Sequence, residues 1–81
     1  MSDFKVGQTY AAKKPRKIFL GLSSYWNDRQ ILWVGTDSIQ YDSPTINDGR
    51  RYPTTTLDMF RKWAGENVTA KMPEGEWRRT D

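Results

Sequence analysis

Apolar residues along the first half of the chain fall into short runs, with Gly, Asn, Asp and Pro between the runs. This spacing is typical of short strands joined by tight turns. The run at 30–35 is continuously apolar and predicts a central strand, whereas 38–42 alternates and predicts a half-buried one. The segment 6–12 is predicted to form a turn that leads into a first strand. Further strands are predicted at 17–26, 30–35, 38–42 and 68–72, with a short edge strand at 51–54.

The turn pair Asn27-Asp28 lies between two of the predicted strands, 17–26 and 30–35. Asn and Asp favour turns because their side chains hydrogen-bond the local backbone. We therefore expect a hairpin around this pair. Gly21, inside the first of its strands, is expected to mark a bulge or a close backbone contact.

One helix is predicted, from about Thr55 to Ala64. Thr55 would be its N-cap, with Asp58 at the third helical position as in a capping box. Leu57 and Phe60 fall on one face, and Gly65 follows as the expected C-terminal cap. Arg61 and Lys62 lie in the last turn, where cations interact favourably with the helix dipole. A helix of about nine residues is too short to stand alone, so it should pack on the sheet.

These elements predict a mainly β fold with one short helix, arranged as a small antiparallel SH3-like barrel that is partly open. We expect residues 1–72 to form this single domain and residues 73–81 to form a polar C-terminal tail. The core is expected to contain four aromatic residues, and Trp26 and Trp77 are expected to be exposed. The expected core aromatics are Phe19, Trp33, Phe60 and Trp63.

The composition excludes several classes of function. The 81 residues include no Cys and no His. Zinc, haem, copper and iron–sulfur sites depend on these side chains, so we expect no metal and no cofactor. A nucleophilic Ser would lack a His partner, and the Asp residues lie in predicted turns or a helix cap. Gly residues are isolated, which excludes a Gly-rich phosphate loop. We therefore expect a protein that is not an enzyme.

The first five residues, Met1–Lys5, lack the apolar core of a signal peptide. No apolar run approaches the roughly 20 residues needed to cross a bilayer. We therefore expect a cytoplasmic protein with no membrane partner.

Positive charge is the main chemical signal of the sequence, although the formal net charge is only +3. Four cations flank Pro15 with no acid among them, and two arginines follow the long loop. Such clusters suit phosphates or an acidic protein surface, and they are also compatible with a solvated turn at a strand edge. Tyr25 and Trp26 could stack on bases or anchor a protein interface. The candidate binding residues are Lys13, Lys14, Arg16, Lys17, Tyr25, Trp26, Arg50 and Arg51.

Two segments carry a resemblance to known proteins. Val6-Gly7-Gln8-Thr9-Tyr10 opens the first strand, and Leu57-Asp58-Met59-Phe60 opens the helix. Over residues 4–72 this layout resembles small phage and prophage proteins of unassigned function. The step before the helix departs from their pattern, because Tyr52-Pro53 and three Thr stand there. The resemblance implies a phage accessory protein acting in the host cytoplasm, and it carries over no binding residue.

Two functions follow as hypotheses. The first is a non-catalytic protein that binds a host protein of the transcription, defence or nucleic-acid-processing machinery and inhibits or redirects it. The second is a nucleic-acid-binding SH3-like or OB-like module. Either would act as a monomer or a weak homodimer.

Overall fold

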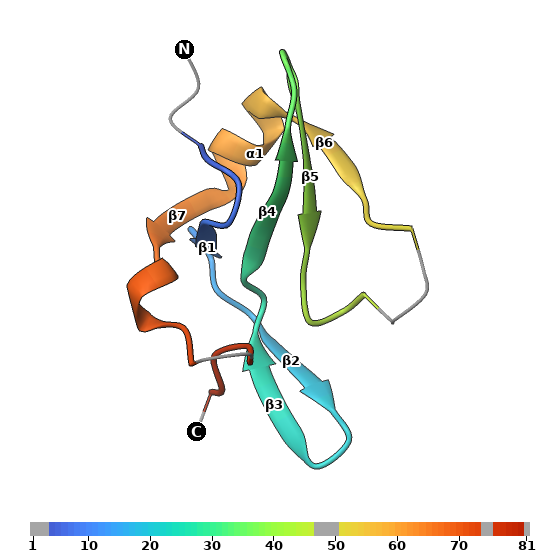
Figure 1. The fold of residues 1–81 in the computed structure, drawn as a ribbon. Coiled ribbons are helices and arrows are strands. Elements are labelled where there is room, and N and C mark those ends of the chain that lie inside the picture. The colour runs from blue at the N-terminus through green and yellow to red at the C-terminus, as the bar shows by residue number, and fades with distance from the viewer. Residues whose placement is uncertain (1–3, 47–50, 74–75, 81) are drawn as a thin grey trace.

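The computed structural model describes residues 4–46, 51–73 and 76–80. Over these residues the chain forms strands, one α-helix and one 3-10 helix (Figure 1). In chain order the elements are β1 (Thr9–Ala12), β2 (Lys17–Leu20), β3 (Ser23–Trp26), β4 (Arg29–Val34), β5 (Ser38–Asp42), β6 (Thr54–Thr56), α1 (Leu57–Trp63), β7 (Ala64–Asn67) and η1 (Thr69–Lys71).

Five strands make one antiparallel sheet in the order β6-β5-β4-β1-β7, and β2 and β3 pair separately. The predictions of a mainly β antiparallel fold with one short helix and of a central strand at 30–35 are confirmed. The sheets are not closed into a barrel, because β6 and β7 stand at opposite edges of the larger sheet. Helix α1 directly follows β6 and directly precedes β7, so it carries the chain from one edge to the other (Figure 1).

The predicted hairpin around Asn27-Asp28 is wrong. The segment 17–26 is itself a hairpin, in which β2 pairs with β3 from Lys17↔Trp26 to Leu20↔Ser23. Gly21 forms its turn and not a bulge: its φ is 63°, a left-handed conformation that glycine adopts without steric cost. The β2–β3 hairpin projects away from the larger sheet (Figure 1).

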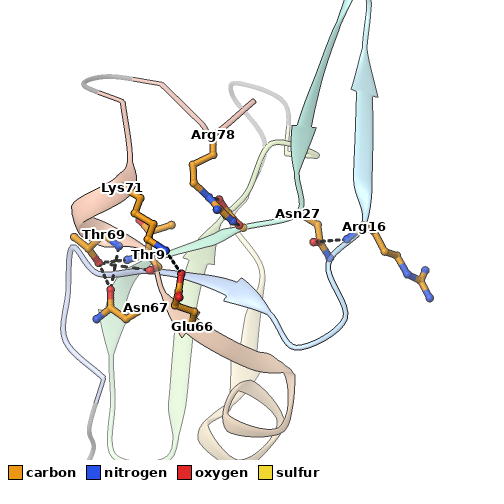
Figure 2. Close-up of polar contacts among 9 residues, drawn as sticks. Thr9, Arg16, Asn27, Glu66, Asn67, Thr69, Lys71 and Arg78 are labelled. Atoms are coloured by element: carbon orange, nitrogen blue, oxygen red, sulfur yellow. Dashed lines mark hydrogen bonds and ion pairs between the residues drawn. The ribbon is translucent and has the colours of Figure 1, made fainter. Parts of the chain in front are cut away.

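Asn27 and Asp28 form the joint between the hairpin and the larger sheet. The Arg16 backbone N–H donates to Asn27 Oδ1 at 2.9 Å, and the Asn27 N–H donates to the Arg16 carbonyl at 3.1 Å (Figure 2). The Asp28 side chain is 1% exposed, and Arg78 donates two hydrogen bonds to its carboxylate, at 2.7 and 2.8 Å. The hydrogen bond with Asp28 raises the pKa of Arg78, while its partial burial acts in the opposite direction.

The C-terminal residues are attached to the hairpin. The Trp26 N–H donates to the Arg78 carbonyl at 3.1 Å, and the Thr80 N–H donates to the Ser24 carbonyl at 3.1 Å. Tyr25 and Arg79 form an antiparallel bridge. The segment expected as a polar tail therefore runs beside β3, and Trp77 within it is half-buried and not exposed as expected.

The core lies between α1 and one face of the larger sheet. Phe60 is completely buried and meets the rings of Phe4, Tyr10 and Trp63 at centroid distances of 5.0, 6.0 and 5.4 Å. Its place in the core is confirmed, and Trp63 packs against the core partly buried. The buried core residues are Phe4, Ile31, Ile39, Phe60 and Ala64.

Two aromatics expected in the core lie outside it. Phe19 is 74% exposed because it belongs to the projecting hairpin, where no second layer covers it. Trp33 is 51% exposed. Its neighbour Val34 packs on the core, and successive strand residues point to opposite faces, so Trp33 points to the face that α1 does not cover. Trp26, expected to be exposed, is half-buried.

The helix begins one residue later than predicted. Thr56 is the N-cap, and its hydroxyl accepts a hydrogen bond from the Met59 N–H at 3.1 Å. At the other end Gly65 is not a left-handed cap. Ala64 is extended and begins β7, which pairs with β1. The predicted strand at 68–72 is also wrong, since Thr69–Lys71 is the 3-10 helix.

Side chains of β7 and η1 secure the last edge of the sheet to β1 (Figure 2). The Thr9 N–H donates to Thr69 Oγ1 at 2.9 Å, and the Thr69 N–H donates to Asn67 Oδ1 at 3.0 Å. Lys71 pairs with Glu66 at 2.7 Å, and this hydrogen bond lowers the pKa of the Glu66 carboxyl. None of the helices described in the structure is of a length and apolarity that would span a membrane.

Phe60→Ala should lower the free energy of unfolding by about 3–5 kcal/mol, because it leaves a cavity at the only ring that contacts Phe4, Tyr10, Tyr41 and Trp63 together in the described core. Urea denaturation measures this change. Met59→Ala is the matched control in the preceding helical position, where the side chain is 58% exposed. It should change the free energy of unfolding by less than about 0.5 kcal/mol. Equal effects of the two substitutions would contradict the assignment of Phe60 as the centre of the core.

Arg78→Ala should destabilise the protein by roughly 3 kcal/mol, because it leaves the buried Asp28 carboxylate without its cation. Arg79→Ala removes the same charge from an exposed neighbour and should have little effect on denaturation. A negligible loss for Arg78→Ala would show that the C-terminal segment does not stabilise the joint.

Candidate anion-binding groove

The loop between β1 and β2 lies beside the C-terminal end of α1. The Lys13 N–H donates to the carbonyl of Trp63 at 2.9 Å, which fixes the start of the loop against the last residue of the helix. Lys62, in the last turn of α1, therefore lies near a basic loop that is remote from it in sequence. Arg29, at the start of β4, directly follows the joint formed by Asn27 and Asp28 and adds a further cation to this region.

Between these elements lies a concave space of about 510 Å³. Five of its lining residues are cationic and none is acidic, so an anion inside it would meet charge of one sign. The lining residues are Ala12, Lys13, Lys14, Arg16, Asn27, Arg29, Lys62 and Trp63.

A second hollow of about 320 Å³ adjoins the first, since Arg16, Asn27 and Arg29 line both. It adds the hairpin residues Lys17 and Ile18 on one side. On the other side it adds residues of β5 and of the loop after it. These further residues are Tyr41, Ser43, Thr45, Ile46 and Pro53. We call the two hollows together the basic groove.

Arg29 lines both hollows of the basic groove, and its guanidinium lies over two aromatic rings. Its guanidinium carbon is 4.4 Å from the centroid of Tyr41 and 4.2 Å from that of Trp63. Burial lowers the pKa of Arg29, and the nearby Tyr41 acts in the opposite direction. Among the residues that the structure describes, no carboxylate forms an ion pair with Arg29. A partly desolvated cation without a counter-ion attracts an anion more strongly than one in bulk water.

Cation–π contacts do not neutralise a guanidinium, whose N–H donors form a planar fork. Such a fork matches two oxygens of a phosphate or a carboxylate. The lysines around it provide flexible charges at the rim. The groove can thus hold an extended anion. Within residues 4–46, 51–73 and 76–80 there is no cluster of three metal-ligating side chains.

The structure brings together four of the eight predicted binding residues. Lys13 and Lys14 line the first hollow, Lys17 lines the second, and Arg16 lines both. Arg51 is exposed and lines neither hollow, and Arg50 lies outside the described residues. Arg51 therefore does not join the basic residues 13–17 in the groove.

Tyr25 and Trp26 also lie away from the basic groove. They are half-buried in β3, opposite Ile18 and Lys17, and line neither hollow. Sequence reasoning missed Arg29 and Trp63 as site residues. Arg29 follows a turn pair and Trp63 carries a helix-face signal, so both were explained by local structure alone. A half-buried arginine can be recognised only from its neighbours in space.

No family model matches the chain, and neither the curated proteins nor the solved structures that were searched include a match.

Arg29→Met should change the free energy of unfolding by less than about 1 kcal/mol. It removes two cation–π contacts, but it also removes the cost of partly burying a charge, and the methionine sulfur packs well against rings. Urea denaturation measures the change, with Arg78→Ala as the reference for an arginine that stabilises the fold. A decrease in the free energy of unfolding above about 2 kcal/mol would mean that Arg29 stabilises the fold, which would contradict a role limited to ligand binding.

Proposed function

We propose that the protein is a non-catalytic nucleic-acid-binding protein that holds phosphates in the basic groove. The observation that carries the proposal is a pair of adjoining hollows lined by six cations and no carboxylate. Five of the six line the first hollow, and Lys17 joins them in the second. Lysine and arginine side chains that neutralise phosphates supply most of the affinity of such proteins, through release of counterions.

The distribution of ion pairs supports this proposal. Three cations elsewhere in the described chain form ion pairs, Arg61 with Asp58, Lys71 with Glu66 and Arg78 with Asp28, whereas Lys5, Arg51 and Arg79 form none with described residues. The cations of the basic groove have no such pairs with described residues. The weak net charge of +3 therefore hides a local excess of positive charge on one surface.

Recognition through this groove would depend on the phosphate backbone more than on base stacking. Arg29 already lies over the rings of Tyr41 and Trp63, so we expect these rings to contribute little to stacking on bases. Contacts to phosphates position a nucleic acid without reading its sequence. We therefore propose binding with little sequence preference and strong dependence on salt.

Fluorescence anisotropy with labelled DNA tests the proposal. Affinity should fall linearly with salt on a log–log scale, with a slope of about −0.9 for each neutralised phosphate of a duplex and about −0.7 for a single strand. The double variant Lys13→Ala, Lys14→Ala should bind more weakly and reduce the duplex slope by roughly 1.8.

The matched control is the double variant Lys5→Ala, Arg79→Ala. It removes the same charge from two exposed positions that do not line the groove, and it should keep most of the affinity and the slope. Equal weakening in both variants would indicate attraction by net charge alone. Absence of binding at about 50 mM salt, for both DNA and RNA, would reject the function.

An acidic protein surface is the second candidate ligand. The stacked guanidinium of Arg29 favours it, since its fork accepts a carboxylate in the same geometry as a phosphate. If the resemblance to phage accessory proteins holds, this partner would be a host protein. The same pair of double variants in a pull-down would then separate capture through the groove from capture without it.

A further inference from the structure

The tip of the β2–β3 hairpin exposes apolar side chains that no described part of the chain covers. We call Phe19, Leu20, Gly21 and Leu22 the apolar tip. Phe19 is 74% exposed, Leu20 44%, and Leu22 fully exposed. Burying such side chains is favourable by about 25 cal/mol for each Å² removed from water, and a cluster of them on a small protein marks an interaction site.

Along β2, the side chains change from charged at the base of the hairpin to apolar at its tip. Arg16 and Lys17 lie at its base, where Arg16 is hydrogen-bonded to Asn27 (Figure 2). Ile18 is next along β2, and the apolar tip follows. At about 3.3 Å per residue, four residues of strand extend roughly 13 Å from the cations to the turn.

The base of the hairpin is part of the basic groove, because Arg16, Lys17 and Ile18 line its second hollow. A polyanion lying in the groove would therefore continue onto the hairpin, and the tip would meet whatever lies beyond its phosphates. In duplex DNA, stacked base pairs lie there. An apolar surface of this kind is matched by the faces of unstacked bases, and DNA-bending proteins insert Phe, Leu or Ile between base steps.

We propose that the apolar tip is a wedge that enters duplex DNA at a base step and kinks it while the basic groove holds the adjacent phosphates. This inference rests on the proposed function and goes beyond it, because backbone binding alone requires no apolar insertion. Continuity with the basic groove favours DNA over a second copy of the chain, because Arg16, Lys17 and Ile18 at the base of the hairpin line the second hollow.

The bend is measured by energy transfer between dyes at the two ends of a duplex of about 25 base pairs. Wild type should raise the transfer efficiency at saturation. It should also raise the fluorescence of a 2-aminopurine at the kinked step, since that probe brightens when unstacked. A duplex with one central mismatch should bind about tenfold more tightly than the matched duplex, because part of the unstacking is already done.

The variant Phe19→Ser, Leu22→Ser should keep salt-dependent binding, lose both optical signals, and bind mismatched and matched duplexes about equally. Both residues are exposed, so the variant should fold, and thermal denaturation checks this. The control Val6→Ser, Met59→Ser removes apolar side chains that are 64% and 58% exposed elsewhere, and should bend DNA like wild type.

Three outcomes would overturn the wedge. The first is a Phe19→Ser, Leu22→Ser variant that still bends DNA. The second is a dimer in light scattering that this variant converts to a monomer, which would assign the tip to a second copy. The third is sedimentation of the wild-type protein with anionic lipid vesicles that the Phe19→Ser, Leu22→Ser variant loses, which would assign the tip to a lipid surface. Binding that depends on Lys13 and Lys14 but produces no bend in wild type would reject the wedge and keep the proposed function. Binding to RNA alone would do the same, whereas absence of binding to both DNA and RNA would reject both.

Discussion

The arrangement of the molecule depends on the ion pair between Asp28 and Arg78. Asp28 lies between β3 and β4, at the point where the chain leaves the hairpin and enters the larger sheet. A carboxylate that is 1% exposed requires compensation, and the bidentate guanidinium provides it. The pair therefore attaches the C-terminal segment to the joint and fixes the direction of the hairpin. Since the hairpin forms one side of the basic groove, the shape of the groove depends on this contact too.

Arg78 and Arg29 are both half-buried, but their charges are treated differently by the fold. Arg78 meets a carboxylate, so its charge is compensated inside the protein. Arg29 forms no ion pair with the described residues and lies over the rings of Tyr41 and Trp63, so its charge stays available to a ligand. Retaining such a charge adds little to stability. Sites adapted for binding commonly keep features that the fold alone would not select.

Local signals in the sequence predicted the parts of the fold that depend on neighbours along the chain. The apolar periodicity of 57–64 indicated the helix and Phe60 its buried face, and the run at 30–35 indicated a central strand. Gly21 was misread because a positive φ serves a bulge or a turn equally well, and only pairing shows which. Phe19 and Trp33 were placed in the core because hydrophobicity does not reveal whether a second layer exists. In the site, Lys13 to Lys17 were visible as a cluster, but Arg29 and Lys62 joined it through tertiary structure alone.

The position of β1 has a consequence for how the chain is assembled. This first strand is paired on both sides, with β4 and with β7, and its contact with η1 joins Thr9 to Thr69, 60 positions away. The β2–β3 and β4–β5 pairs are local and can form as soon as they are synthesised. One edge of β1 stays open until β7 emerges from the ribosome. Contacts of such long range slow folding, and an unpaired edge invites association with other chains. The nascent protein is thus most vulnerable to aggregation in the interval between the synthesis of β1 and the synthesis of β7.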